Sequence, residues 1–496
     1  QESRGLGDVY KRQVLVMKIS QIYKLNKTQY ELDFVDIDPE IDTPLFLDPY
    51  YISKCDFDFA ITADSSIRSY FEFLLALLRN NDVKEAEELF SYLGENNDIC
   101  FGMSRGKPNG HGMGPKDTSL IFQQLLQSNA IKTGVMEDIE DFRIFVPNVD
   151  KDKVSDMTAN IFKIHLLEYT KEQCFLHNIP LTPNIPSGMY WNQKTKSWDN
   201  NYTERLILNN KPILLVPKRI VSYSDKYTPT EYRQHFVLNY LQNEHLRLQT
   251  ALMRTRKDKS KYVTKKSVID SEETMDKDYL AKFTKQHPEI FKNFKEQTST
   301  KLQPIDGYVT NPLDITSICK YLSDKLSTLS PGSSEASNYH NLIIGILELL
   351  FYPNLSTPKK ETPIHEGRKR IDITFNNSSS NGFFFNLPTK DSSLNCPFIF
   401  IECKNYVGEV KNPELDQLSG RFSPRRGRVG ILTCRALDES NSFMKRCSDT
   451  LNDGRGLIIP ITDIDLNRAL SEFPLKGTSA IENILNEKYQ QIVFPK

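Results

Sequence analysis

Two hydrophobic patterns divide the chain into helical and extended segments. Apolar side chains recur three and four positions apart in residues 65–93, 117–178 and 228–252, which predicts amphipathic helices. RIDITF (370–375) alternates apolar and polar residues, and PFIFIECKNY (397–406) is a short apolar run that ends in charge. Both patterns are typical of strands. The chain therefore combines a largely helical first half with a second half that contains a sheet.

Length and local composition predict several domains, because a globular domain usually has about 100 to 200 residues and the chain has 496. The start, SRGLGDVYKRQ, resembles a translated sequencing adapter, so we expect the natural protein to begin at Met17. We expect four segments: a non-native leader (1–16), a mainly helical α+β sensor or regulatory domain (17–252), a charged linker or helical connector (253–310) and an α/β domain (311–496).

Charge, apolar runs and cysteine spacing argue against a strongly basic nucleic-acid-binding protein, a membrane-spanning protein and a disulfide-bonded protein. The formal net charge is -1, so any contact with nucleic acid has to come from local basic patches. No apolar run approaches the roughly 20 residues that span a bilayer, so we expect a cytoplasmic chain without a membrane contact. The eight cysteines contain no CxxC pair, and we expect reduced, buried thiols.

Two polar stretches in the first half invite a ligand-binding interpretation. Acidic residues are frequent between Asp33 and Asp48, but their spacing is not that of a calcium loop, and solvated turns and helix caps are favoured over metal binding. Five glycines lie between Gly102 and Gly114. Their spacing differs from that of a phosphate-binding loop, and a flexible loop is favoured over a nucleotide or phosphate contact.

The end of the second predicted strand carries the strongest chemical signal. Side chains alternate between the two faces of a strand, so Glu402 and Lys404 share one face. If this strand pairs with residues 370–375, Asp372 can approach Glu402. Two adjacent carboxylates repel each other unless a proton or a cation lies between them. A hard divalent cation with oxygen ligands suits this position.

Asp372 followed by Glu402-x-Lys404 on the next strand resembles the signature of the PD-(D/E)XK nuclease superfamily, although Ile371 stands where the family has a proline. The resemblance covers about residues 330–465. It implies a restriction-endonuclease-like fold, in which helices flank a central mixed sheet. The expected element order is helix, three strands, helix, strand, helix, strand, with residues 376–396 as a polar loop between the two catalytic strands.

The resemblance also implies the roles of individual residues. Asp372, Glu402 and the backbone carbonyl of Cys403 would hold Mg²⁺ or Mn²⁺, while Lys404 would orient or deprotonate the attacking water. Gln417, on the helix after the catalytic strands, would lie close to the site.

Glu348 is the one charge in a helix from Tyr339 to Tyr352 that is apolar nearly all round. A helix of that kind is buried, and a buried carboxylate is costly unless it is paired or binds a metal. The family often has such a glutamate as a supporting metal ligand, which makes Glu348 a candidate. The alternative is a carboxylate bonded to Lys or Arg.

Two basic clusters are candidates for binding nucleic acid. Residues 254–266 contain seven Lys or Arg residues and one Asp, and this run fits either a phosphate backbone or a solvated linker. The candidate contacts in it are Arg254, Arg256 and Lys257. A second cluster follows Gln417 and contains Arg421, Arg425 and Arg426, which would suit phosphate binding beside a cleavage site or form a plain surface cluster.

Three functions are compatible with these features. The first is a metal-dependent DNA endonuclease, acting on double-stranded DNA in bacterial defence against phage. The second is a structure-specific repair or recombination nuclease, and the third is a nucleic-acid-binding scaffold with an inactive nuclease fold. The chain has no ATP-hydrolase motif, so a separate ATPase or another defence-operon protein would be a partner. We also expect a homo-oligomer.

Overall fold

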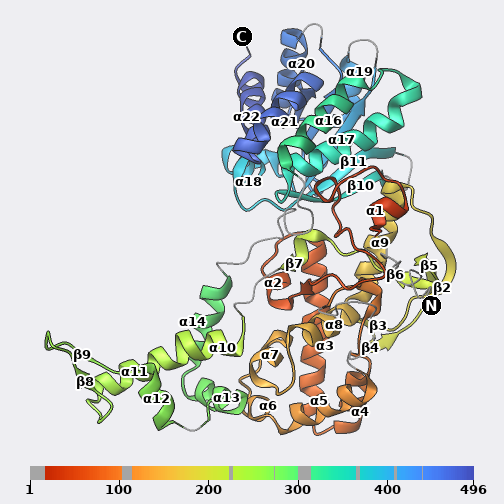
Figure 1. Ribbon diagram of the computed structural model, residues 1–496. Coiled ribbons are helices and arrows are strands. Elements are labelled where there is room, and N and C mark those ends of the chain that lie inside the picture. The colour runs from red at the N-terminus through yellow and green to blue at the C-terminus, as the bar shows by residue number, and fades with distance from the viewer. Residues whose placement is uncertain are drawn as a thin grey trace, which may run out of the picture.

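The computed structural model describes residues 17–102, 114–222, 227–272, 274–299, 314–364, 369–406, 410–437 and 440–495 (Figure 1). The leader 1–16 and most of the glycine-rich stretch, residues 103–113, lie outside the described residues. A mainly helical N-terminal region is followed by a C-terminal region built around a five-stranded sheet. The expected combination of helices with a mixed sheet is confirmed at this level.

The N-terminal region consists mostly of helices. They are α1 (Ile19–Ile22), α2 (Pro49–Ser53), α3 (Asp58–Arg79), α4 (Val83–Ser91), α5 (Pro115–Gln127), α6 (Asn129–Thr133), α7 (Phe142–Phe145), α8 (Lys151–Ile161), α9 (Lys163–His177), α10 (Pro229–Tyr232), α11 (Leu238–Arg247), α12 (Lys265–Ser271), α13 (Lys277–Gln286) and α14 (Pro288–Ser299). Short 3-10 turns are η1 (Gln29–Glu31), η2 (Asn97–Ile99), η3 (Ile139–Asp141) and η4 (Lys218–Ile220). Most of these helices, α13 and α14 included, share one large apolar core, whereas α12 contributes to a separate small one.

Short strands complete the N-terminal region. They are β1 (Phe46–Leu47), β2 (Thr182–Pro186), β3 (Tyr190–Asn192), β4 (Ser197–Asp199), β5 (Tyr202–Leu208), β6 (Lys211–Ile213), β7 (Val221–Ser222), β8 (Arg254–Thr255) and β9 (Lys261–Tyr262). β2, β5 and β6 form one sheet, while β1 pairs with β7, β3 with β4 and β8 with β9. Among the described residues, no helix is long and apolar enough to cross a membrane.

The apolar run from Ile213 to Val221, whose composition suggests a buried strand bent at Pro217, is buried throughout but is a strand only at its two ends. It passes from β6 through an extended stretch and η4 into β7. Pro217, which has no backbone N–H, makes only an isolated bridge to Phe34 at this point. The helix expected over residues 228–252 is largely present as α10, a π-helical turn (Arg233–Val237) and α11.

The acidic residues between Asp33 and Asp48 are mostly buried and not solvated, although Asp48 caps a helix as expected. Asp33 accepts hydrogen bonds from the Tyr169 hydroxyl (2.6 Å) and the Thr357 backbone N–H (3.0 Å). Asp36 accepts from Ser20, and Asp48 caps α2. Because these oxygens are hydrogen-bonded, the carboxylates can be buried, and Asp33 joins the two regions of the chain.

The segment expected as a charged linker or helical connector contains the strands β8 and β9 and the helices α12, α13 and α14. β8, β9 and α12 surround a small separate core of Leu238, Val263, Val268 and Met275. α13 and α14 instead pack into the N-terminal core, because Phe283, Phe291 and Phe294 turn their rings toward it. The charge of this segment therefore lies on folded elements.

The C-terminal sheet has the strand order β10-β11-β12-β13-β14. Its strands are β10 (Leu355–Ile364), β11 (Lys369–Asn377), β12 (Phe398–Lys404), β13 (Val429–Cys434) and β14 (Leu457–Thr462). The first three strands pair antiparallel, and β12, β13 and β14 pair parallel. β13 and β14 are buried at every position, as is typical of parallel strands covered on both faces.

Helices surround this sheet (Figure 1). They are α16 (Ile315–Thr328), α17 (Ala336–Phe351), α18 (Gly382–Lys390), α19 (Asn412–Ser419), α20 (Ser440–Asn452), α21 (Asp463–Lys476) and α22 (Ser479–Val493). The expected order of helices and strands is present, with one addition: the segment expected as a polar loop contains α18. The sequence there is polar, but Phe383, Phe384 and Leu387 form a buried face that stabilises the helix.

Candidate active site

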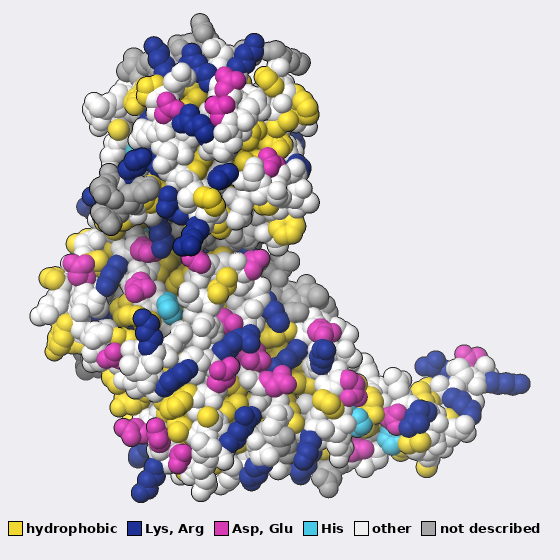
Figure 2. Space-filling model, turned by 180° about the vertical axis from the view of Figure 1, so that it is seen from behind, with side chains coloured by type: hydrophobic (Ala, Val, Ile, Leu, Met, Phe, Trp, Pro, Cys, Tyr) yellow, Lys and Arg dark blue, Asp and Glu magenta, His cyan; other side chains and the backbone are white. Residues whose placement is uncertain are grey.

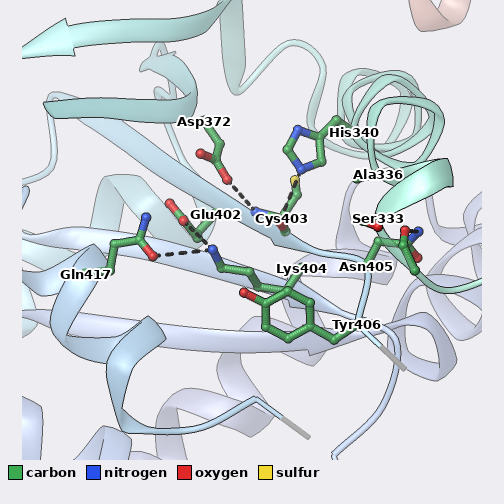
Figure 3. Close-up of a pocket in the computed structure, with 11 residues that line it drawn as sticks. Ser333, Ala336, His340, Asp372, Glu402, Cys403, Lys404, Asn405, Tyr406 and Gln417 are labelled. Carbon is green, nitrogen blue, oxygen red and sulfur yellow. Dashed lines mark hydrogen bonds and ion pairs between the residues drawn. The ribbon is translucent and has the colours of Figure 1, made fainter. Parts of the chain in front are cut away.

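A pocket of about 590 Å³ lies where β12 ends (Figure 3). The side chains of Asp372, Glu402, Lys404 and Gln417 line it from β11, β12 and α19. His340 lines the opposite side from α17. The pocket therefore brings together the four polar side chains that the sequence selects as catalytic candidates, and it adds a histidine that the sequence does not select.

Strand register explains how Asp372 reaches Glu402. β11 and β12 pair antiparallel, with Ile373 opposite Ile401. One step further along this register, Asp372 faces Glu402. The regular pairing ends there, and an Asp372 Oδ2 accepts a hydrogen bond from the Cys403 backbone N–H (3.2 Å). The strand ends thus hold the two carboxyl groups at one edge of the sheet.

Glu402 is fully buried, with no exposed surface, and two cations surround it. Lys404 Nζ lies 2.8 Å from Glu402 Oε1, and Arg421 Nη1 forms an ion pair with Glu402 Oε2. A buried carboxylate without such partners would be strongly unfavourable. With Asp372 included, two acidic side chains lie beside two basic ones, and all but Arg421 line the pocket.

Lys404 is held between two acceptors. Besides the ion pair with Glu402, its Nζ donates to Gln417 Oε1 at 3.4 Å, and it lies 5.8 Å from the centre of the Tyr406 ring. Gln417 comes from α19, which packs on the same face of the sheet because Phe422, just after the helix, stacks on Phe400 of β12. The ammonium group is therefore fixed in direction and remains at the pocket.

His340 and Arg421 are the site residues that sequence reasoning misses in these roles. His340 Nε2 donates to the Cys403 carbonyl at 3.2 Å, the same oxygen that is expected to bind a metal. The only feature of the sequence that could have pointed to His340 is that it is a polar residue on the helix before the strands. Arg421 is expected on the surface as a phosphate contact, but it is buried in the site. Burial lowers the pKa of Arg421, against the opposing charge of Asp372.

The remaining basic candidates lie elsewhere. Arg425 is exposed and does not line the pocket, whereas Arg426 is half-buried and donates to the backbone carbonyl of Arg421 at 3.2 Å. Arg254, Arg256 and Lys257 lie on the β8–β9 hairpin, outside the C-terminal region. The pocket therefore does not collect all the basic residues that the sequence marks for nucleic acid.

Glu348 does not line the pocket. It lies eight residues after His340 on α17, about 12 Å along the helix. Its Oε2 faces Lys218 Nζ of the N-terminal region at 3.4 Å. The position of Glu348 therefore does not support its predicted role as a metal ligand. It fits the alternative, a carboxylate paired with a lysine. The reason is packing, since the last turns of α17 contact the N-terminal region.

The Glu348 pair predicts a pH dependence of stability. Burial raises the pKa of Glu348 to about 8, against the opposing charge of Lys218. At pH values between the ordinary pKa of glutamate and 8, the folded protein holds a proton on Glu348 that the unfolded chain has released. The contribution of Glu348 to the stability of the folded state is therefore highest at low pH and falls as the pH rises toward 8. Glu348→Gln should therefore gain thermal stability relative to the wild type between pH 5 and 8, by at most about 1.4 kcal/mol per pH unit. An unchanged difference between the two melting midpoints across this range would contradict the assignment.

The donor set at the pocket fits a hard divalent cation in chemistry. Two carboxylates and the carbonyl of Cys403 offer oxygen ligands, and the open pocket leaves room for water and a phosphate. Among the described residues, no group of three or more His, Cys, Asp and Glu side chains is placed to hold a metal. Asp372 and Glu402 would thus need the carbonyl and external ligands, and Arg421 would have to release Glu402.

The comparisons with known proteins concern the other half of the chain. Residues 24–228 match a family described as "Domain of unknown function (DUF8370)". No curated protein and no solved structure matches the chain. The matched range ends before the C-terminal sheet, so the chemistry of the pocket has to be derived from its own side chains.

Proposed function

We propose that the C-terminal region is a restriction-endonuclease-like domain of the PD-(D/E)XK type, and that its pocket hydrolyses phosphodiester bonds of DNA with Mg²⁺ or Mn²⁺. The observation that carries the proposal is the placement of Asp372, Glu402 and Lys404 together at the end of β12. A carboxylate pair beside a fixed ammonium group suits hydrolysis of a phosphodiester, which needs a cation, a positioned water and charge compensation.

Each side chain has a distinct role in this proposal. Asp372, Glu402 and the Cys403 carbonyl would hold the cation, which when bound polarises the phosphate and lowers the pKa of a coordinated water. Lys404, fixed by Glu402 and Gln417, positions the attacking water and offsets negative charge on the phosphate. His340 fixes the direction of the Cys403 carbonyl through its hydrogen bond. Gln417 positions Lys404.

Arg421 competes with the cation for Glu402 in this arrangement. Replacing it with glutamine removes the competing charge, so Arg421→Gln should bind Mn²⁺ about tenfold more tightly, because a hydrogen bond to a charged group contributes about 1.5–3 kcal/mol. Titration calorimetry without DNA measures this affinity, and the exposed Arg425→Gln is the control, with wild-type affinity. Weaker Mn²⁺ binding by Arg421→Gln would mean that Arg421 organises the carboxylates instead.

The biological setting is part of the proposal. We place the nuclease in the cytoplasm, as a homo-oligomeric effector of bacterial defence against phage that cuts double-stranded DNA, with any ATP-dependent step supplied by a partner protein. A repair or recombination nuclease is the second candidate, since the same pocket chemistry would serve it. A scaffold with an inactive fold is less well supported, because Asp372, Glu402 and Lys404 are all present.

The proposal is tested by incubating the full chain with supercoiled plasmid, linear duplex, branched duplex and single-stranded RNA. Each substrate is tested with Mg²⁺, with Mn²⁺ and with EDTA. Cleavage of plasmid and linear duplex with metal, and none with EDTA, is the expected result. Preference for branched DNA would favour the repair nuclease, and cleavage of RNA alone would contradict DNA as the substrate. Absence of cleavage on every substrate with either metal would favour the scaffold.

A further inference from the structure

An arm, residues 238–275, projects from the N-terminal region and ends in a basic hairpin, residues 254–262 (Figures 1 and 2). The arm consists of α11, the strands β8 and β9, and α12, around its own small core. Figure 2 shows Lys and Arg side chains gathered at its tip. We infer that the basic hairpin is a binding element for duplex DNA, inserted along a groove between the two phosphate backbones.

The hairpin is a regular pair of strands closed by a turn, whereas a solvated linker has no regular structure. Arg254 pairs with Tyr262 and Thr255 with Lys261. The turn is closed by backbone hydrogen bonds, from the Arg256 N–H to the Ser260 carbonyl at 2.8 Å and from the Lys259 N–H to the Arg256 carbonyl at 3.0 Å. Lys259 takes the left-handed conformation that such a turn requires (φ 69°). The charged side chains therefore project from a fixed frame.

The cations lie on both faces of this two-stranded ribbon. Arg254 is on the same face as its cross-strand partner Tyr262, and Arg256 joins them because its guanidinium lies 4.8 Å from the centre of the Tyr262 ring. Lys261 projects from the opposite face, since side chains alternate along a strand. A ribbon inside the major groove has a phosphate backbone on each side, so cations on both faces suit that position.

The basic side chains of the hairpin are not there to pair with acidic side chains in the part of the chain that the structure describes. Arg254, Arg256, Lys257, Lys259 and Lys261 are all exposed. Asp258, the one acid of the run, accepts hydrogen bonds from the Ser260 N–H (2.9 Å) and hydroxyl (2.6 Å). Since the whole chain has a formal net charge of -1, this concentration of positive charge is local. An unneutralised basic ribbon fits a polyanion in which charges repeat along two strands.

The test measures DNA binding in EDTA, so that it does not depend on cleavage by the C-terminal pocket. The full chain is titrated with a fluorescent duplex of about 30 base pairs at salt concentrations from roughly 50 to 200 mM. The test variant carries Arg254→Gln, Lys257→Gln and Lys261→Gln. The control carries Lys84→Gln, Lys116→Gln and Lys194→Gln, three exposed lysines of the N-terminal region, and changes the net charge equally.

The hairpin variant should bind duplex at least about tenfold more weakly than the control, and its slope of log K against log salt should fall by up to about 2.7, because each lost phosphate contact contributes about 0.9. Both variants should keep the melting midpoint of the wild type, since the replaced side chains are exposed. Equal affinities and slopes for the two variants would overturn the inference. So would tighter binding of a single strand than of the duplex, or no duplex binding by the wild type.

Discussion

Replacing Lys404 with alanine is expected to reduce metal-dependent DNA cleavage by at least about 100-fold. The ammonium group is held 2.8 Å from Glu402 and 3.4 Å from Gln417, so alanine removes a cation that is fixed at the pocket. The loss should appear in the rate of the chemical step at saturating DNA, measured by single-turnover cleavage of a labelled duplex, because Lys404 would contact one phosphate among many along the substrate.

Two comparisons separate this effect from a loss of folding. Lys320→Ala, which removes an exposed lysine of α16, should cut DNA at the wild-type rate. Lys404→Ala should bind duplex in EDTA with wild-type affinity. A variant that cuts DNA within about threefold of the wild type would remove Lys404 from the chemistry; the threefold limit corresponds to about 0.65 kcal/mol of barrier.

Replacing Lys295 with methionine is expected to destabilise the N-terminal region by about 3–5 kcal/mol, since it removes the cation from a buried acidic cluster. Lys295 Nζ lies 3.0 Å from Asp141 and 3.1 Å from Asp138. Burial acts to lower the pKa of Lys295, but the charges of Asp141, Glu140 and Asp138 outweigh burial and raise it. Without the lysine, Asp141 and Glu140 would be buried without a compensating charge.

The two tryptophans, Trp191 and Trp198, lie in the N-terminal region, so their fluorescence follows urea unfolding of this region alone. Lys292→Met, an exposed position on the same helix, should change stability by less than about 0.5 kcal/mol. The deficit of Lys295→Met should become smaller as the pH falls, because burial raises the pKa of Glu140 well above its ordinary value and protonation removes its charge. A deficit below about 1 kcal/mol at pH 8 would mean that the cluster needs no cation.

Local rules predict the parts of the site that depend on neighbouring residues. Alternation along a strand places Glu402 and Lys404 on one face, and they form an ion pair in the structure. The expectation for Gln417 rests on the family resemblance instead of a local rule, and its side chain lines the pocket. The eight cysteines are all free, as their spacing and apolar surroundings predict.

The parts that sequence does not predict depend on contacts between distant segments. The position of Glu348 is decided by Lys218, 130 residues earlier in the chain, which no periodicity connects to it. The sequence suggests that Arg421 is one of several surface arginines. In the structure Arg421 follows the end of α19, and its side chain forms an ion pair with the buried Glu402. Asp33 reads as a solvated acid, yet Tyr169 and Thr357 satisfy its oxygens. In each case the partner in space overrides the local composition.

Plasmid cleavage by Asp372→Asn tests the central claim most directly. Asparagine keeps the size of the side chain and an oxygen that can accept from the Cys403 N–H, but it removes the charge that would hold a cation. With Mg²⁺ or Mn²⁺, the wild type should nick and linearise supercoiled plasmid, and Asp372→Asn should leave it intact while binding duplex as the wild type does in EDTA. Metal-dependent cleavage by Asp372→Asn at the wild-type rate would contradict the assignment of this pocket as the nuclease centre.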